Sequence, residues 1–279
     1  MDIHDWQAYR AEHRLISVLT CYDYTFARIL NTTNIDALLV GDSLAMVMHG
    51  HNSTLNATVD MMTLHVKAVS QGAPDKFIIA DMPFLSDRQG LPACMEAIRK
   101  LMSAGAQAIK LEGSVDQLDL ITHIVNSGVP VMGHLGLTPQ SVNALGGYKV
   151  QGREQKAAEK ILTAAKALEA AGCFAIVLEC VPITLAKTIT NSLSIPTIGI
   201  GAGSEVSGQV LVLHDMLGLQ TEFKPKFVKH YLPGAELVSQ AVNQYVSEVS
   251  QSLYPQKEHS FHDHSNQKPQ QVANTTSDA

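Results

Sequence analysis

Three apolar stretches of the sequence each run into a carboxylate. They read LLVGDS at 38–43, FIIAD at 77–81 and AIKLE at 108–112. Short apolar runs of this kind are typical of buried strands. If the strands are parallel and joined by helices, their carboxyl-terminal ends gather on one rim, so Asp42, Asp81 and Glu112 would lie together. Crowded acids repel one another, and their hard oxygens suit Mg²⁺ or a similar cation.

Three further residues could act at the same rim. Glu179 follows another strand-like run, at 174–178. Lys110 lies two residues before Glu112, so the alternation of a strand sends both side chains to one face. An inward-facing lysine needs an anion, which could be the carboxylate of a substrate or, as a structural ion pair, Glu112 or Asp81. His134 ends a further strand and is either a site residue or a structural histidine.

Strand-like and helix-like segments alternate along the chain, which predicts an α/β fold with a closed parallel sheet, the (β/α)8 or TIM barrel. The expected strands are 16–22, 38–41, 77–81, 108–112, 128–133, 174–178, 196–200 and 210–213. The expected helices include a short one at 5–13 before the barrel, 115–126 and 154–171 within it, and a final one at 234–254. Only a short Gly- and Ser-rich piece separates the last two strands.

Length and loop pattern fit one domain over residues 1–254 and a polar tail over 255–279, whose distal part is expected to be disordered. A barrel of this type takes roughly 250 residues. Two long connections, 43–58 and 134–153, follow strands on the rim that carries the acids. Long loops over a barrel mouth are usually functional, so we interpret both as active-site loops.

Composition excludes several classes of protein. Of the 279 residues, 46% are hydrophobic and 16% charged, and the net charge is −6 without a long basic run. We therefore expect no nucleic-acid or anionic-membrane partner. The N-terminal stretch is charged, and no run approaches the roughly 18 apolar residues of a membrane span, so the expected location is cytoplasmic. Four scattered cysteines form no metal or redox motif and are interpreted as buried thiols.

The sequence resembles the ketopantoate hydroxymethyltransferase (3-methyl-2-oxobutanoate hydroxymethyltransferase) family over about residues 15–262. The matching stretches are YDY at 22–24, LLVGDSLAMVMHGHNSTL at 38–55, ADMPF at 80–84, KLEG at 110–113, GHLGLTPQSVNALGGYKVQGR at 133–153, LECVP at 178–182, IGIGAG at 198–203 and LVLHDMLG at 211–218. One departure is Ser207-Gly208-Gln209, where many members of the family have Asp-Gly-Gln.

The resemblance implies an activity. Such an enzyme transfers a hydroxymethyl group from 5,10-methylenetetrahydrofolate to 3-methyl-2-oxobutanoate, giving 2-dehydropantoate in the first step of pantothenate biosynthesis. The reaction passes through a metal-stabilised enolate. The resemblance also implies Mg²⁺, or a similar divalent cation, and a homodecamer made of two pentamers.

The resemblance also assigns roles to residues. Asp42, Asp81 and Glu112 would surround the metal, and Glu179 would be the general base. Substrate contacts would come from Ser43 and Lys110, together with Asp42, Asp81 and His134 on the same rim.

Two alternatives come from other classes of protein. One is a metal-dependent carbon–carbon lyase or mutase of the phosphoenolpyruvate mutase and isocitrate lyase type, which also acts on 2-oxo acids at a barrel rim. Such enzymes often carry a reactive cysteine in a mobile loop, and neither long loop here contains one. The other is a catalytically dead barrel that binds a metabolite, for which loss of one of the acids would be the signature.

Overall fold

The computed structural model describes residues 1–113, 115–221 and 225–261. Contacts divide the chain into two compact units, Met1–Leu232 and a second that begins at Pro233. The first unit contains every strand of the described residues, and the second contains a long helix. The predicted single domain over 1–254 stays a prediction, and the expected disorder of the distal tail falls on residues 262–279, outside the described ones.

Eight parallel strands close into a barrel in which each strand pairs with its neighbours in sequence and β8 pairs with β1, as the alternation of segments predicted. The strands are β1 (Ile16–Thr20), β2 (Ala37–Val40), β3 (Phe77–Asp81), β4 (Ala108–Glu112), β5 (Val131–Gly136), β6 (Ala175–Glu179), β7 (Thr197–Ile200) and β8 (Gly208–Leu211). The predicted (β/α)8 barrel is confirmed.

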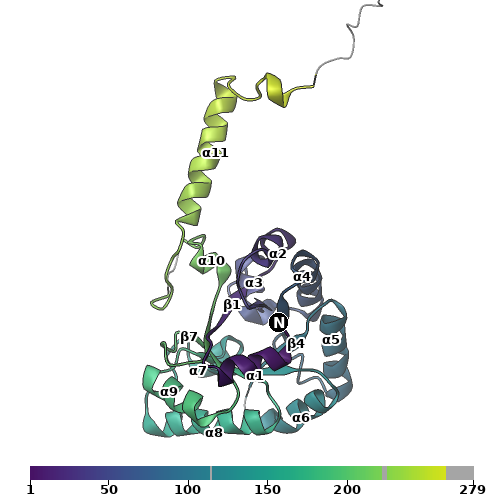
Figure 1. Ribbon diagram of the computed structural model, residues 1–279, viewed down its shortest axis with the longest axis vertical. Helices are drawn as coiled ribbons and strands as arrows, with labels where there is room; N and C mark the ends of the chain where they lie inside the picture. Colours follow the sequence, from purple (N-terminus) through teal and green to yellow (C-terminus); the bar gives the residue numbers. More distant parts are fainter. Residues whose placement is uncertain (114, 222–224, 262–279) are drawn as a thin grey trace, which may run out of the picture. The chain divides into compact units, whose positions relative to one another are not determined.

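Helices precede, connect and follow the strands in the sequence. They are α1 (Ile3–Ala11), α2 (Tyr24–Asn31), α3 (Leu44–Val47), α4 (Val59–Gly72), α5 (Leu91–Ser103), α6 (Leu118–Asn126), α7 (Val142–Leu145), α8 (Gln155–Ala170), α9 (Ile183–Ser192), α10 (Leu213–Met216) and α11 (Gly234–Ser250). Figure 1 shows helices α2, α4, α5, α6, α8 and α9 around the strands. Residues 201–207, between β7 and β8, form turns without a helix. No helix in the described ranges combines the length and the apolarity that a membrane crossing needs.

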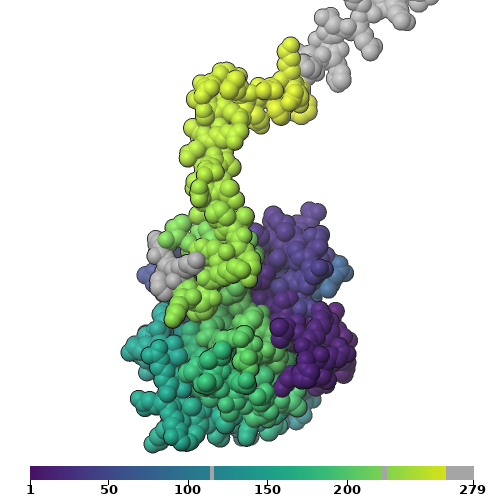
Figure 2. Space-filling model, turned by 60° about the vertical axis from the view of Figure 1, so that its left-hand side comes forward, coloured from purple at the N-terminus to yellow at the C-terminus, as the bar shows by residue number. Residues whose placement is uncertain are grey.

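Two apolar layers result from the alternation of side chains along each strand. Leu39 and Ile79 point into the barrel, whereas their neighbours Leu38 and Ile78 face the helices outside it. Burial on both faces explains why the strands read as continuous apolar runs in the sequence. On the face shown in Figure 2, the first helix (dark purple) and the barrel helices (teal to green) form one continuous surface.

Helix α1 covers the amino-terminal end of the barrel. Its Trp6 is fully buried, with ring centroids 5.8 Å from Phe77 at the start of β3 and 5.2 Å from Phe174 just before β6. The helix begins earlier than the predicted 5–13 because the Asp2 side chain caps it, accepting hydrogen bonds from the backbone N–H groups of His4 and Asp5. Helix α1 and Trp6 thus close the amino-terminal end of the barrel, and the polar residues lie at the opposite, carboxyl-terminal end.

Some predicted boundaries were wrong by two or three residues. Strand β5 runs to Gly136 rather than ending at residue 133, because it pairs along the whole of β6 up to Glu179. His134 therefore lies within the strand and not at its end. Strand β8 is Gly208–Leu211 rather than 210–213, because its pairing with β1 begins at Gly208 and ends at Leu211. A Cβ at Gly208 would collide with the Ile16 carbonyl across this pair. Glycine is rare in strands, so the sequence pattern concealed this start.

The ends of two helices also differ from the prediction. The segment predicted as one helix over 115–126 starts with a 3-10 turn, Val115–Gln117, before α6 begins. The last helix, predicted to reach residue 254, ends at Ser250. Two residues after it, Ser252 has a left-handed backbone with φ of 56°.

Candidate active site

The predicted acids and their cationic partners lie on adjacent strands at the carboxyl-terminal end of the barrel. Strand register places Asp81 of β3 beside Lys110 of β4, and Glu112 of β4 beside His134 of β5. Glu179, the last residue of β6, pairs with Gly136 of β5. The structure therefore brings these sequence-predicted residues onto one rim.

Hydrogen bonds and ion pairs connect the first half of this rim. The backbone N–H of Asp42 donates to Asp81 Oδ2 at 3.0 Å. The other oxygen of Asp81, Oδ1, lies 2.5 Å from Lys110 Nζ, and Lys110 Nζ lies 4.0 Å from Glu112 Oε1. Lys110 thus forms the structural ion pair that was one of its two interpretations, with Asp81 as the nearer partner.

His134 connects the second half of the rim. Its Nδ1 lies 3.3 Å from Glu112 Oε1 and its Nε2 lies 3.3 Å from Glu179 Oε2. The imidazole is buried, and so is the side chain of Glu112, whereas that of Glu179 is 17% exposed. Among these linked acids Glu179 is the one that a ligand in the barrel mouth can reach most easily.

Glycine at position 136 allows β5 and β6 to approach at this point. Its φ is +96°, and a Cβ there would collide with the backbone carbonyl of Glu179. The carbonyl of Glu179 also accepts a hydrogen bond from the N–H of Leu137 at 2.8 Å. The backbone that carries Glu179 is therefore fixed by its neighbour strand.

Burial and like charge shift the pKa values of the two aspartates in one direction. Burial, together with the charges of Asp81 and Glu112, raises the pKa of Asp42 well above its ordinary value. Burial also raises the pKa of Asp81, and the ammonium group of Lys110 opposes this rise. Asp42 differs from Asp81 because the described contacts give its carboxylate an amide partner, Gln140, and no ion pair. Its negative charge is the least compensated on the rim.

The pKa values of the other buried groups, Lys110, Glu112 and His134, shift in the direction that favours the charged form of each side chain. Burial lowers the pKa of Lys110, but the charges of Asp81, Glu112 and Asp42 outweigh it and raise the pKa above its ordinary value. Burial raises the pKa of Glu112, whereas its contacts with His134 and Lys110 bring it below the ordinary value. Burial and Lys110 disfavour charge on His134, yet the two glutamates raise its pKa to about 9.

Ser43 follows Asp42 directly at the start of α3. Its Oγ lies 2.7 Å from Tyr22 Oη, a hydroxyl pair in which either oxygen can donate. A Cβ at Gly41 would lie 3.0 Å from Ser43 Oγ and 3.4 Å from Asp81 Oδ2. The glycine of the VGDS stretch therefore keeps room for the two polar side chains beside Asp42.

Sequence reasoning missed three side chains near the rim. Gln140 and Tyr148 come from the long loop after β5, and Tyr22 follows β1. Gln140 bonds directly to two of the acids, through its side chain to Asp42 and its backbone to Glu112. Partial burial and the negative charges of Glu179, Asp42 and Glu112 raise the pKa of Tyr148. The sequence predicts a functional loop here, but an irregular backbone offers no periodicity from which to select individual residues.

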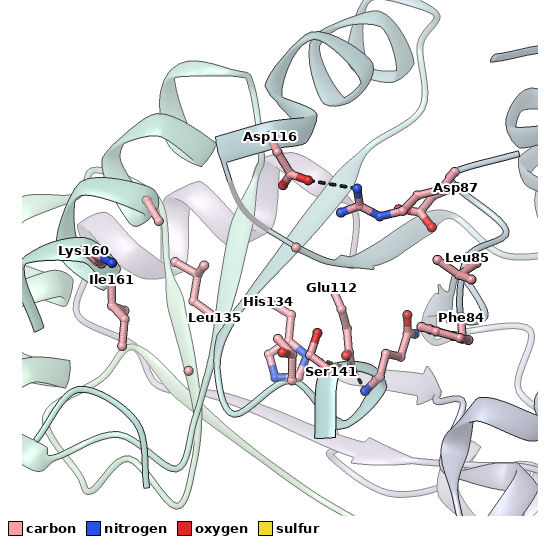
Figure 3. A pocket seen from close by; sticks show the side chains of 16 residues that line it. Phe84, Leu85, Asp87, Glu112, Asp116, His134, Leu135, Ser141, Lys160 and Ile161 are labelled. Atoms are coloured by element: carbon pink, nitrogen blue, oxygen red, sulfur yellow. Dashed lines mark hydrogen bonds and ion pairs between the residues drawn. The ribbon is translucent and has the colours of Figure 1, made fainter. Parts of the chain in front are cut away.

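A cavity of about 460 Å³ opens beside Glu112 and His134. Figure 3 shows Phe84 and Leu85 on one side of it, Lys160 and Ile161 of α8 on another, and Glu112, His134 and Ser141 between them. Arg88 and Asp116 form an ion pair at 2.8 Å along its edge. The cavity offers both apolar walls and charged groups next to the rim.

The donor set fits a divalent cation by its chemistry. Asp42, Asp81 and Glu112 supply hard carboxylate oxygens, and the buried carboxylate of Asp42 makes no ion pair with the described residues. In the described part of the chain, however, no three His, Cys, Asp or Glu side chains are arranged to hold one metal ion together. Lys110 stands among these carboxylates as their nearest cation.

The closed parallel barrel with buried acids, a lysine and a histidine at the carboxyl-terminal ends of its strands defines a (β/α)8-barrel enzyme. A family model described as ketopantoate hydroxymethyltransferase matches residues 1–257. The chain belongs to the ketopantoate hydroxymethyltransferase family.

Curated relatives agree over nearly the whole chain. A 3-methyl-2-oxobutanoate hydroxymethyltransferase of Bdellovibrio bacteriovorus is 58% identical over 261 residues, covering 94% of this chain and 98% of the relative. One of Francisella tularensis subsp. novicida is 57% identical, covering 90% and 95%. One of Coxiella burnetii is also 57% identical, covering 92% and 97%.

Two solved structures of other enzymes have a similar fold. A phosphonopyruvate hydrolase in complex with oxalate and Mg²⁺ has a TM-score of 0.60 and 11% identity, covering 93% of each chain. A 2,3-dimethylmalate lyase of the PEP mutase/isocitrate lyase superfamily has a TM-score of 0.58 and 16% identity, covering 88% of each chain. At such identities the likeness shows the barrel fold alone. Membership of the hydroxymethyltransferase family therefore decides against the lyase or mutase alternative.

The shifted pKa of His134 gives a prediction about pH and stability. Its folded pKa of about 9 lies above the unfolded value of about 6.5. The stabilisation from its charged form is therefore complete below the unfolded value and is lost as the pH rises through about 9. In urea unfolding, the free-energy gap between the wild type and His134→Gln should be larger at pH 6 than at about pH 9.5.

The exposed His123 of α6 supplies a matched control. His123→Gln should leave a small gap that does not change between these pH values. A gap for His134→Gln of equal size at both pH values would contradict a charged histidine between Glu112 and Glu179.

Proposed function

We propose that the chain transfers a hydroxymethyl group from 5,10-methylenetetrahydrofolate to 3-methyl-2-oxobutanoate, giving 2-dehydropantoate and tetrahydrofolate in the first step of pantothenate biosynthesis. The observation that carries the proposal is the continuous rim from Asp42 through Lys110 and His134 to Glu179, in a chain of this family. This rim would bind a cation and a carboxylate and would supply a general base.

Asp42, Asp81 and Glu112 would hold Mg²⁺ or a similar divalent cation. When bound, such a cation supplies a Lewis acid that stabilises negative charge on the oxo group of the substrate. Asp42 is the strongest of the three candidates, because it is buried and its carboxylate lacks a described ion pair. The carboxylate of Glu112 already has protein partners on both oxygens, because His134 contacts Oε1 and the backbone N–H of Gln140 donates to Oε2.

Lys110 and Ser43 would bind the carboxylate of the oxo acid. The pKa of Lys110 is raised, so the side chain keeps its charge and can offer it to an anion. Ser43 presents a hydroxyl already oriented by Tyr22. Asp42, Asp81 and His134 would complete the walls around the bound acid. These contacts orient the substrate with its C3 toward the remaining carboxylate.

Glu179 would remove the proton from C3. A base must be accessible to the substrate, and the side chain of Glu179 is 17% exposed while that of Glu112 is 3% exposed. Removal of the proton leaves an enolate, whose C3 forms a bond to the methylene carbon of the folate. Water supplies the hydroxyl group, and the bonds from that carbon to the two folate nitrogens break. The proton taken from C3 and the second proton of the water go to those two nitrogens, which gives tetrahydrofolate. The cavity of about 460 Å³ beside Glu112 and His134 offers space for the donor next to the rim.

The reaction is tested by incubating the purified full-length chain with 3-methyl-2-oxobutanoate, 5,10-methylenetetrahydrofolate and Mg²⁺. We expect 2-dehydropantoate and tetrahydrofolate in equal amounts, and loss of both products when the divalent cation is chelated. Turnover that continues unchanged with excess chelator would refute the metal requirement. Absence of product under all conditions would refute the reaction.

The base is tested separately by exchange of the C3 proton of 3-methyl-2-oxobutanoate for deuterium. Glu179→Gln removes the base but keeps the size of the side chain, so exchange should fall by at least about 100-fold. Binding of Mg²⁺ and the oxo acid, followed by calorimetry, should persist. Glu205→Gln alters an exposed acid that pairs with Lys187 of α9 and has no described contact with the rim residues, and it should exchange at the wild-type rate. Normal exchange in Glu179→Gln would assign the base elsewhere.

We further propose that the chain acts as a homodecamer of two pentamers. Helix α11 exposes apolar side chains at Val238, Val242, Tyr245 and Val249, each about half exposed. Their spacing of four, three and four residues is that of a helix seam that packs on another helix. A second copy of this chain is the partner we propose for it.

Sedimentation equilibrium of the full-length chain should give about ten times the 30.1 kDa chain mass. Val242→Glu places a charge in the seam and should lower that mass, whereas Gln240→Glu on the same helix should not. A monomeric wild type would refute the assembly.

A cytoplasmic location is also part of the proposal. All four cysteines are free, as expected in a reducing compartment. The expectation that they are buried thiols holds for Cys21, Cys94 and Cys173, and Cys180 is half-buried. Recovery of the chain outside the cytosolic fraction of its own cells would contradict this location.

A further inference from the structure

Gln140 is the residue at which the loop after β5 meets the acids of the rim. It is the central residue of the 3-10 turn Pro139–Ser141, which begins just beyond the end of β5. Neither the expected base nor the expected substrate contacts include it. Its contacts reach the ends of three other strands.

Both parts of Gln140 donate hydrogen bonds to the strand ends. The backbone N–H donates to Glu112 Oε2 at 2.9 Å, at the end of β4. The side-chain Nε2 donates to Asp42 Oδ2, just after β2, and to the carbonyl of Met82, just after β3, each at 2.9 Å. One residue of the loop thus holds two of the three expected metal ligands.

The side-chain amide of Gln140 is fixed by these bonds. An amide nitrogen has two hydrogens, and the two acceptors use both of them. The Met82 carbonyl belongs to the backbone after β3, so it anchors the amide while the second hydrogen points at Asp42. A charged acceptor makes this second bond the stronger type. The orientation of the Asp42 carboxylate therefore depends on where the loop places Gln140.

We propose that Gln140 is a positioning residue that orients Asp42 toward a divalent cation and holds Glu112 at a set distance from it. This inference rests on the proposed function, because it assigns the hydrogen bonds around the expected metal ligands. Groups that hydrogen-bond to metal ligands commonly account for about 10- to 100-fold of metal affinity. Docking of the loop through Gln140 would thus complete the site.

Gln140→Met tests this role, because methionine has a similar length and keeps the backbone N–H to Glu112 but cannot donate to Asp42 or Met82. Mg²⁺ is titrated into the full-length protein by calorimetry, with and without 3-methyl-2-oxobutanoate. We expect Mg²⁺ to bind about 10- to 100-fold more weakly than in the wild type. In turnover, the Mg²⁺ concentration for half-maximal rate should rise by a similar factor, while kcat at saturating Mg²⁺ should change much less.

Gln151→Met is the matched control, since Gln151 lies in the same loop and its side-chain amide donates to the Lys149 carbonyl and not to an acid. It should bind Mg²⁺ as the wild type does. Circular dichroism and thermal unfolding establish that each variant is folded. If Gln140→Met does not fold, Gln140→Asn keeps an amide that is too short to bridge Met82 and Asp42, and it should show the same weakening.

The outcomes separate this inference from the reaction itself. A folded Gln140 variant that binds Mg²⁺ within twofold of the wild type would overturn the positioning role and leave the proposed reaction standing. Equal losses in Gln140→Met and Gln151→Met would also overturn it, because the effect would then belong to the loop as a whole. A wild type that turns over without binding Mg²⁺ would overturn the metal assignment and this inference together.

Discussion

The site depends on compensation of buried negative charge at one end of the barrel. Four carboxylates, those of Asp42, Asp81, Glu112 and Glu179, face two cationic side chains, Lys110 and His134. Each uncompensated charge in such surroundings costs several kcal/mol. Two negative charges remain after pairing, and burial together with the charges of Asp81 and Glu112 raises the pKa of Asp42. A bound divalent cation carries the charge that would balance this excess.

The barrel supplies the geometry for this arrangement. Parallel strands of matched register place side chains from adjacent strands at one level, so Asp81 meets Lys110 and Glu112 meets His134. The packed interior beneath, closed at the far end by Trp6, excludes water from the base of the site. Low polarity around the rim strengthens both the attractions and the repulsions there. The barrel backbone is therefore fixed, whereas a bound ligand can change which charged side chains on the rim pair with one another.

Much of this could be predicted from the sequence because strands have a simple period. The runs that end at Asp81 and Glu112 have the bounds that the sequence predicted, and the two-residue spacing of Lys110 and Glu112 places them on one face. His134 was located less well, since pairing with β6 extends β5 beyond the point where its apolar run stops. Gln140 could not be found, because its contacts depend on the path of an irregular loop after Pro139. Loop residues are placed by tertiary contacts, which the sequence does not display as a pattern.

Lys110 can form a structural ion pair and also bind a substrate carboxylate. Its ammonium lies 2.5 Å from Asp81, an expected metal ligand, and its pKa is raised by three acids rather than by this one partner. If Asp81 shares its charge with a cation, the attraction between Asp81 and Lys110 weakens, and the lysine stays protonated beside Glu112 and Asp42. Its charge is then available to a substrate carboxylate that arrives near the same point. Lys110 would then pair with Asp81 before the cation and the substrate bind, and with the substrate carboxylate afterwards.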